Sequence, residues 1–213
     1  MRVKVCGITR LEDAQAAADL GAFALGFVFW PASPRFVDAE RARSIVRALP
    51  PFVTAVGVFV DQPQADVNAV ADRVGLGAVQ LHGNETPEYC EGITRRVIRA
   101  IGLPETTDIS SILEWPSSVT LLVDAYDPEK HGGTGRPVNW TVAARIASRR
   151  PTILSGGLRA ENVVTAITTV RPYAIDVSSG VEERPGVKDA RRLRAFFEAV
   201  AEVAAGSRQE GRL

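Results

Sequence analysis

The sequence predicts an α/β protein in which helices cover a parallel sheet. Short apolar runs of strand length alternate with helical patterns, and most of these runs are apolar almost throughout. The strand-plus-helix unit also recurs eight times in succession along the chain. This number is typical of a single (β/α)8 barrel, or TIM barrel, although an open doubly wound sheet has the same local signals.

The first half of the chain contains four of the units. The run Val3–Cys6 is rich in β-branched residues and precedes an Ala-rich helical pattern at Leu11–Leu20. In the other three, an apolar run is followed by a helical pattern: Ala24–Phe29 by Ala39–Leu49, Thr54–Val60 by Ala65–Val74, and Ala78–Leu81 by a short helix at Pro87–Glu91.

The second half repeats the alternation. The units are Arg96–Ile101 with a weak helix at Asp108–Glu114, Val119–Asp124 with Trp140–Arg149, Thr152–Leu154 with Ala160–Val170, and Ala174–Val177 with Val187–Ala205. We expect residues 1–205 to form one barrel domain. The polar residues 206–213 are expected to form a disordered C-terminal tail.

Composition and charge describe an ordinary globular chain. Its 213 residues are 46% hydrophobic and 23% charged, which argues against disorder. The 25 basic residues balance the 25 acidic ones, so net charge predicts no nucleic-acid partner. Two cysteines are too few for a disulfide framework, and no Cys or His spacing fits a zinc site. Because the sequence shows no signal-peptide pattern and no apolar stretch of about 18 residues, we expect a cytoplasmic protein that does not contact membranes.

The first strand ends in a cysteine at the edge where barrels carry their active sites. Cys6 stands at the C-terminal end of this strand, and Lys4 points to the same side because it lies two residues earlier. A lysine inside a barrel needs a partner, and we expect Asp176, on the strand that closes the barrel, to provide it. The alternative is that Cys6 is a small buried hydrophobe, as free cysteines usually are.

Two further side chains follow the second and fourth strands. Arg35 lies in a Pro-rich loop and is suited to bidentate binding of a carboxylate or phosphate, unless it is an ordinary surface arginine. His82 shares a strand face with Gln80 and is a candidate acid, base or hydrogen-bond donor to substrate. In the alternative interpretation His82 is merely packed, while Asn84 or Glu85 caps the next helix.

The sixth strand ends in Asp124. A carboxylate that ends an apolar strand is costly to bury unless it is hydrogen-bonded or functional, so Asp124 is a candidate acid or base. The alternative is an aspartate that anchors its loop. The glycine-rich segment 132–135 follows and is a candidate lid or anion cradle, although such loops alone are weak signals.

Small residues follow the last two strands. Gly156 and Gly157 come after the seventh strand, and Ser178, Ser179 and Gly180 come after the eighth. Such loops let backbone N–H groups approach an anion, and barrels often bind phosphate at these two places. We therefore expect a phosphate site here rather than two ordinary tight turns.

Together these motifs resemble the phosphoribosylanthranilate isomerase family. The resemblance covers nearly the whole chain in order, which makes it highly specific. It is carried by the segments Lys4–Thr9, Gly26–Phe29, Val56–Val60, Gln80–Gly83, Gly132–Gly135, Leu154–Leu158 and Asp176–Glu182.

The resemblance implies a (β/α)8 fold and a reaction. The expected activity is the Amadori rearrangement of N-(5-phosphoribosyl)anthranilate to 1-(2-carboxyphenylamino)-1-deoxyribulose 5-phosphate in tryptophan biosynthesis, without a metal or redox cofactor. By resemblance Cys6 matches the general base, Asp124 the general acid and Arg35 the residue that holds the anthranilate carboxylate. The glycine and serine loops match the phosphate site. We expect a small phosphorylated substrate as partner and a monomer or homodimer.

One departure from the family pattern follows the glycine-rich segment. The family usually has Phe-Asp-Trp where this chain has Val138-Asn139-Trp140. Asn139 can still cap the following helix, so we expect an altered loop with the chemistry retained.

Three other functions share the phosphosugar-barrel signals. An indole-glycerol-phosphate synthase would be expected to have a catalytic lysine at a strand end, whereas Lys4, Lys130 and Lys188 do not stand in obvious catalytic places. A ribulose-phosphate epimerase would need metal ligands, for which His82 and His131 are too few. A catalytically silent phosphosugar-binding barrel is disfavoured by the presence of both Cys6 and Asp124.

Overall fold

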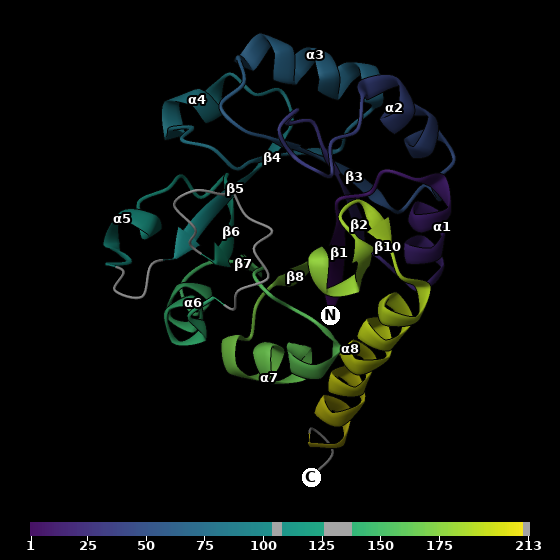
Figure 1. Cartoon of the computed structure of the whole chain (residues 1–213). Coiled ribbons are helices and arrows are strands. Elements are labelled where there is room, and N and C mark those ends of the chain that lie inside the picture. The colour runs from purple at the N-terminus through teal and green to yellow at the C-terminus, as the bar shows by residue number, and fades with distance from the viewer. Residues whose placement is uncertain (104–107, 126–137, 211–213) are drawn as a thin grey trace.

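Eight parallel strands close into a barrel, as the sequence predicts. The structure is a computed structural model that describes residues 1–103, 108–125 and 138–210, with side chains up to residue 203. The strands pair in chain order from β1 to β8, and β8 pairs back onto β1, which excludes the open doubly wound sheet. The helices surround the strands on the outside (Figure 1).

The strand and helix bounds follow the predicted alternation closely. The barrel strands are β1 Arg2–Cys6, β2 Ala24–Val28, β3 Thr54–Phe59, β4 Ala78–Leu81, β5 Arg96–Leu103, β6 Thr120–Ala125, β7 Thr152–Leu154 and β8 Ala174–Val177. The helices are α1 Leu11–Asp19, α2 Ala39–Arg47, α3 Gln64–Val74, α4 Pro87–Glu91, α5 Ser110–Leu113, α6 Trp140–Ala147, α7 Ala160–Val170 and α8 Ala190–Glu210.

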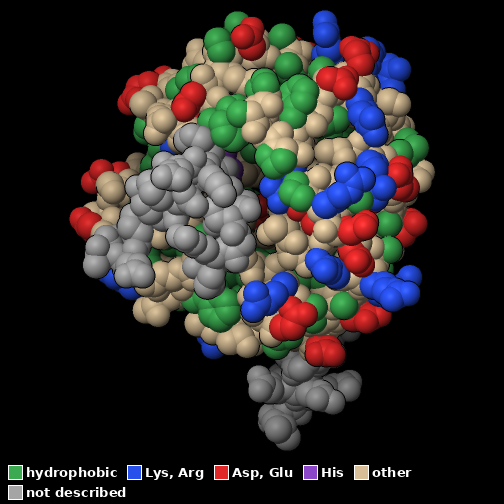
Figure 2. Space-filling view, in the orientation of Figure 1, with side chains coloured by type: hydrophobic (Ala, Val, Ile, Leu, Met, Phe, Trp, Pro, Cys, Tyr) green, Lys and Arg blue, Asp and Glu red, His purple; other side chains and the backbone are tan. Residues whose placement is uncertain are grey.

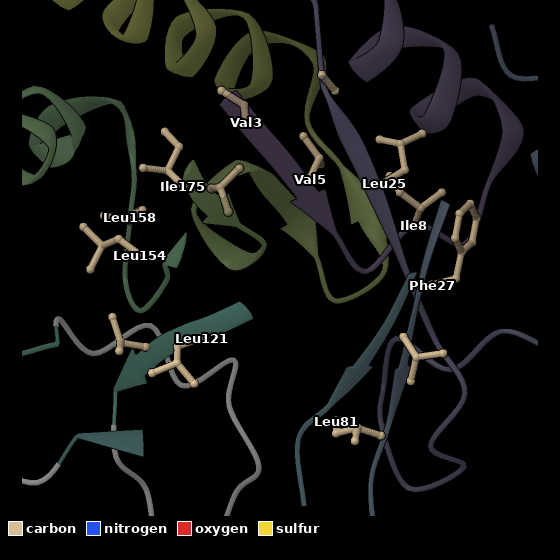
Figure 3. Close-up of a cluster of buried hydrophobic side chains, with 14 of the residues drawn as sticks. Val3, Val5, Ile8, Leu25, Phe27, Leu81, Leu121, Leu154, Leu158 and Ile175 are labelled. Atoms are coloured by element: carbon tan, nitrogen blue, oxygen red, sulfur yellow. The ribbon is translucent and has the colours of Figure 1, made fainter. Parts of the chain in front are cut away.

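Most of the hydrophobic core lies between the barrel and its helices. Alternate strand residues such as Val5, Phe27 and Leu121 point outward into this layer and are fully buried (Figure 3). The other strand face fills the barrel interior with a smaller cluster of mostly small or β-branched residues: Ala24, Val56, Ala78, Ile98, Ala100, Leu122, Ile153 and Ala174. Because both faces are apolar, the charged side chains inside the barrel mouth are conspicuous exceptions.

The connection after β8 differs from the prediction. Instead of entering a helix at Val187, the chain forms a 3₁₀ turn, η1 Ser179–Val181, and then an antiparallel hairpin of β9 Glu182–Arg184 and β10 Val187–Lys188. Gly186 adopts a φ of +78° in the hairpin turn, a conformation that favours glycine. The helix begins only after Asp189, whose carboxylate accepts hydrogen bonds from the N–H groups of Arg191 and Arg192.

The last helix also extends beyond the predicted end at Ala205. It runs through Glu210, whereas residues 211–213 lie outside the described part of the chain. The division of the chain at residue 205 into a barrel domain and a disordered tail stays a prediction.

Side-chain caps fix several helix starts. The predicted Asn139 cap is confirmed, because its amide oxygen accepts from the N–H groups of Thr141 and Val142 at the start of α6. At α4 the cap is Thr86, so the alternative that Asn84 or Glu85 caps this helix is wrong. Glu85 is buried and accepts hydrogen bonds from loop N–H groups and from Arg99.

The surface has mixed character. Basic and acidic side chains are interspersed over the visible, described part of the molecule (Figure 2). Among the described residues, no helix is long and apolar enough to cross a membrane.

Phe27 offers a test of the layer between barrel and helices. Phe27→Ala should lower the free energy of unfolding by about 3–5 kcal/mol, because the ring is fully buried and its loss leaves a cavity. Urea denaturation followed by circular dichroism measures this change. Phe52→Ala is the matched control, since Phe52 is 91% exposed, and it should change stability by less than about 0.5 kcal/mol. Equal effects of the two substitutions would contradict the described packing.

Candidate active site

The predicted ion pair beneath the first strand's cysteine is present. Lys4 Nζ donates to Asp176 Oδ1 at 2.8 Å, and Lys4 and Asp176 face each other in the β1–β8 register. Both are buried, with side-chain exposures of 4% and 6%. Asp176 also accepts a hydrogen bond from Ser155 Oγ at 3.3 Å. The pair therefore forms a compensated charged layer under the barrel mouth.

The Cys6 thiol lies directly above this layer. A Cβ at Gly26, its partner on β2, would come within 2.7 Å of Cys6 Sγ, so only glycine leaves room for the thiol. Burial raises the pKa of Cys6, an effect that the charge of Lys4 opposes. Burial lowers the pKa of Lys4, but the negative charge of Asp176 and the hydrogen bond to it outweigh burial and raise this pKa to about 12. Lys4 is therefore a permanent cation beside a neutral thiol.

Asp124 ends β6 and is also buried. Desolvation raises its pKa to about 6, against the lowering effect of the hydrogen bond that Oδ1 accepts from the Ala125 N–H at 2.7 Å. The negative charge of Asp176 raises the pKa further. A carboxyl with a pKa near neutrality can hold a proton and release it to a substrate, as a general acid must.

His82 lies next to Asp124. Its Nε2 is 3.7 Å from Asp124 Oδ2, and its Nδ1 is 3.1 Å from Gln80 Nε2. Since the amide nitrogen donates, Nδ1 accepts in this arrangement and the ring proton is on Nε2, facing the carboxylate. The structure thus brings the two predicted residues together, with Gln80 fixing the orientation of the ring.

Arg35 is held in place by a carboxylate of the protein itself. Its Nε donates to Glu182 Oε1 at 3.0 Å, and its Nη2 donates to Glu182 Oε2 at 2.7 Å. It is not a freely solvated surface arginine, because its side chain is only 13% exposed. The bidentate partner in the structure is Glu182, and the predicted binding of a substrate carboxylate by Arg35 stays a prediction.

The two small-residue loops lie against each other. Gly156 has a φ of +87°, and a Cβ there would come within 3.1 Å of Asp124 Oδ1. Gly180 packs against the backbone carbonyl of Leu158, so the loops after β7 and β8 are in contact. Gly156, Gly157 and residues 178–180 are only half-buried, which leaves their backbone accessible next to the start of α7. This arrangement suits an anion held by backbone N–H groups.

Sequence reasoning missed two charged residues at this mouth. Glu182 and Lys188 lie on the unpredicted hairpin, and both side chains are at most 3% exposed. Lys188 Nζ donates to the carbonyl of Cys6 at 2.5 Å and to Glu182 Oε1 at 2.9 Å. The signal that could have shown the hairpin is the sequence Pro185-Gly186 followed by the helix-capping Asp189.

The glycine-rich segment 132–135 and His131 lie outside the described residues. Among the residues that are described, no group of three or more His, Cys, Asp or Glu side chains has the arrangement of a metal site.

Comparisons with known proteins agree on one family. The family model for N-(5'-phosphoribosyl)anthranilate (PRA) isomerase matches residues 3–199. The N-(5'-phosphoribosyl)anthranilate isomerase of Pelobacter propionicus is 50% identical over 203 residues, which cover 95% of this chain and 97% of that protein.

Solved structures of this family have the same fold. A phosphoribosyl anthranilate isomerase in complex with reduced 1-(o-carboxyphenylamino)-1-deoxyribulose 5-phosphate is 42% identical, with a TM-score of 0.85 and coverage of 95% and 99% of the two chains. Monomers generated from the dimeric enzyme of Thermotoga maritima are 40% identical, again with a TM-score of 0.85 and coverage of 95% and 99%.

The raised pKa of Asp124 predicts a pH-dependent stability difference. Because folding favours the protonated carboxyl, this contribution is present below the unfolded pKa and is lost as pH rises through about 6. Asp124→Asn should therefore stabilise the fold relative to wild type by about 2–3 kcal/mol more at pH 8 than at pH 4. Urea denaturation at both pH values measures the difference. Asp19→Asn, at an exposed aspartate, is the control, and a pH-independent effect of Asp124→Asn would refute the shift.

The charge of Lys4 should also be visible in the reactivity of Cys6. In a Cys90→Ala background, Lys4→Met should move the pH midpoint of iodoacetamide alkylation upward, because the thiolate loses its neighbouring cation. Arg2→Met removes a cation from the other end of the same strand and should leave the midpoint in place. An unchanged midpoint in Lys4→Met would show that Lys4 does not influence the thiol.

Proposed function

The chain belongs to the N-(5'-phosphoribosyl)anthranilate isomerase family, and we propose that it performs this isomerisation with Asp124 as general acid and Cys6 as general base. The reaction is a step of tryptophan biosynthesis that converts an aminoaldose into an aminoketose. One observation carries the assignment of roles. The barrel mouth holds a buried carboxyl, whose pKa is raised by burial to about 6, and a buried thiol beside the ammonium group of Lys4.

Asp124 supplies the first proton. It donates to the ring oxygen of the ribose, the bond between that oxygen and C1′ breaks, and the nitrogen lone pair forms an iminium at C1′. Burial supports this role, because a desolvated carboxyl is a better proton donor near neutral pH than an exposed one. His82 Nε2 faces the carboxylate that remains and stabilises its negative charge.

Cys6 removes the second proton. Its thiolate takes the proton from C2′, and the C–H electrons form the C1′–C2′ double bond of an enolamine while the iminium nitrogen regains its lone pair. The enolamine then tautomerises to the ketone. Burial makes the thiolate scarce, but it also makes it a stronger base, and the iminium charge acidifies the C2′ proton. Proton exchange with water restores the acid and the base.

Binding groups place C2′ between the two catalytic residues. Arg35 holds the anthranilate carboxylate, and the backbone N–H groups around Gly156, Gly157, Ser178, Ser179 and Gly180 hold the phosphate. The contact between the two loops and the partial exposure of these residues support the phosphate site. Because the substrate is bound at both its carboxylate and its phosphate, the binding energy orients C2′ toward the base.

The remaining expectations complete the proposal. The two proton transfers use residues of this chain and require no metal or redox cofactor. The protein is proposed to act in the cytoplasm as a monomer or homodimer, without nucleic-acid or membrane partners. Its relative from Thermotoga maritima is named as dimeric, which supports the homodimer.

Substitution of the base tests the mechanism. Cys6→Ser should reduce kcat about 10²–10⁴-fold with little change in KM, because the serine hydroxyl is a far weaker acid than the thiol while the binding groups are intact. Steady-state conversion of N-(5-phosphoribosyl)anthranilate measures both constants. Cys90→Ser is the matched control at the other free cysteine. Near wild-type turnover by Cys6→Ser would exclude Cys6 as the base, and binding without turnover by wild type would indicate a silent barrel.

A further inference from the structure

The β9–β10 hairpin brings two buried charges to the barrel mouth that the proposed proton transfers do not use. Glu182 begins β9 and Lys188 ends β10, and their side chains are 3% and 1% exposed. The hairpin is fastened to the loop after β1 and to α1, since Thr9 Oγ1 donates to the Gly186 carbonyl and the Lys188 N–H donates to Asp13 Oδ2 at the start of α1. Burying charged side chains costs free energy, and a hairpin turn does not require it, so we ask what this buried pair does at the barrel mouth.

Glu182 occupies one edge of the Arg35 guanidinium. Nε lies 3.0 and 3.2 Å from the two carboxylate oxygens, and Nη2 lies 2.7 Å from Oε2. A planar guanidinium can bind carboxylates along two edges, and this contact uses the Nε–Nη2 edge. Within the described part of the chain no hydrogen bond is made by Nη1, so the Nη1–Nη2 edge can take a second carboxylate, and Glu182 sets the direction of this edge.

Lys188 ties Glu182 to the backbone that carries the base. Its ammonium group is 2.9 Å from Glu182 Oε1, 2.5 Å from the Cys6 carbonyl oxygen and 3.5 Å from the Ser178 carbonyl oxygen. The Gly186 N–H also donates to Glu182 Oε1 at 3.2 Å. A continuous set of contacts therefore runs from Arg35 through Glu182 and Lys188 to Cys6.

The charges in this set depend on one another. Burial alone would raise the pKa of Glu182, but the hydrogen bonds from Arg35 and Lys188, with the positive charge of Lys188, lower it. Without the carboxylate, two cations would face each other beside the base. Glu182 is thus the anion that allows Arg35 and Lys188 to be buried together.

We propose that Glu182 and Lys188 are positioning residues that fix the carboxylate-binding edge of Arg35 relative to the Cys6 backbone. They thereby set the distance between the guanidinium of Arg35, which holds the anthranilate carboxylate, and the thiol of Cys6, which removes the C2′ proton. This inference rests on the proposed role of Arg35. It predicts that the hairpin contributes to recognition of the substrate carboxylate without touching the phosphate.

The test compares two substrates, N-(5-phosphoribosyl)anthranilate and N-(5-phosphoribosyl)aniline, which lacks the carboxylate. Glu182→Gln should lower kcat/KM for the first about tenfold, mainly through KM, because the amide NH₂ presents donors to Arg35 and Lys188. The kcat/KM for the aniline substrate should change less than about twofold. Glu183→Gln, at the exposed neighbour on the same strand, should leave both constants unchanged.

Three further variants separate positioning from general disruption. Lys188→Met should reproduce the carboxylate-specific loss, and Lys188→Arg should restore most of it. In an Arg35→Ala background, Glu182→Gln should have little further effect, since its partner is absent. Competitive inhibition by inorganic phosphate should be the same in Glu182→Gln as in wild type, because the Glu182 carboxylate contacts Arg35, Lys188 and the Gly186 N–H and not the phosphate loops.

The outcomes distinguish this inference from the function on which it rests. If Arg35→Ala leaves the KM of the anthranilate substrate unchanged, the role of Arg35 fails and the inference fails with it. If Arg35→Ala raises this KM but Glu182→Gln affects both substrates equally, or weakens phosphate inhibition, the positioning role alone is overturned. Additive effects of Arg35→Ala and Glu182→Gln would overturn it as well.

Discussion

The ion pair between Lys4 and Asp176 is the constraint on which the barrel mouth depends. A charged pair inside a barrel is tolerated only with good geometry, and the β1–β8 register supplies it by placing the two residues opposite each other. The β1–β8 register that closes the barrel therefore also places the charges of the site. The same pair affects both catalytic candidates, since Lys4 lies beside the thiol while the charge of Asp176 raises the pKa of Asp124.

The charges around this pair are arranged as a compensated cluster. Lys4 is matched by Asp176, and Arg35 and Lys188 share Glu182. The two proposed catalytic groups, Cys6 and Asp124, lie beside this cluster, and burial raises the pKa of both. For Asp124 this shift brings the pKa toward the range that a general acid needs, whereas for Cys6 it makes the thiolate scarce. The neighbouring pairs keep that desolvated environment electrically balanced.

The barrel and the charged or polar residues at its strand ends could be predicted from the sequence for physical reasons. Buried parallel strands are apolar throughout, so they stand out, and Cys6 and Asp124 are visible as polar interruptions at their ends. Lys4 and Asp176 were paired because strand parity and barrel closure leave few partners. Glu182 and Lys188 were missed because Glu-Glu-Arg has little strand propensity and Val187 fits the helical pattern that follows. Their contacts with Arg35 and Cys6 depend on tertiary packing of distant segments, which no local pattern encodes.

The resting protonation of the site has a consequence for the order of the chemistry. With the thiol pKa raised and the pKa of Asp124 at about 6, the free site holds a neutral acid and a neutral thiol below about pH 6. Proton donation by Asp124 can therefore come first, and the iminium that it creates supplies a positive charge near C2′. That charge favours the thiolate at the moment when a base is required. A buried thiol is thus suited to this role, because its basicity appears only after the substrate ring has opened.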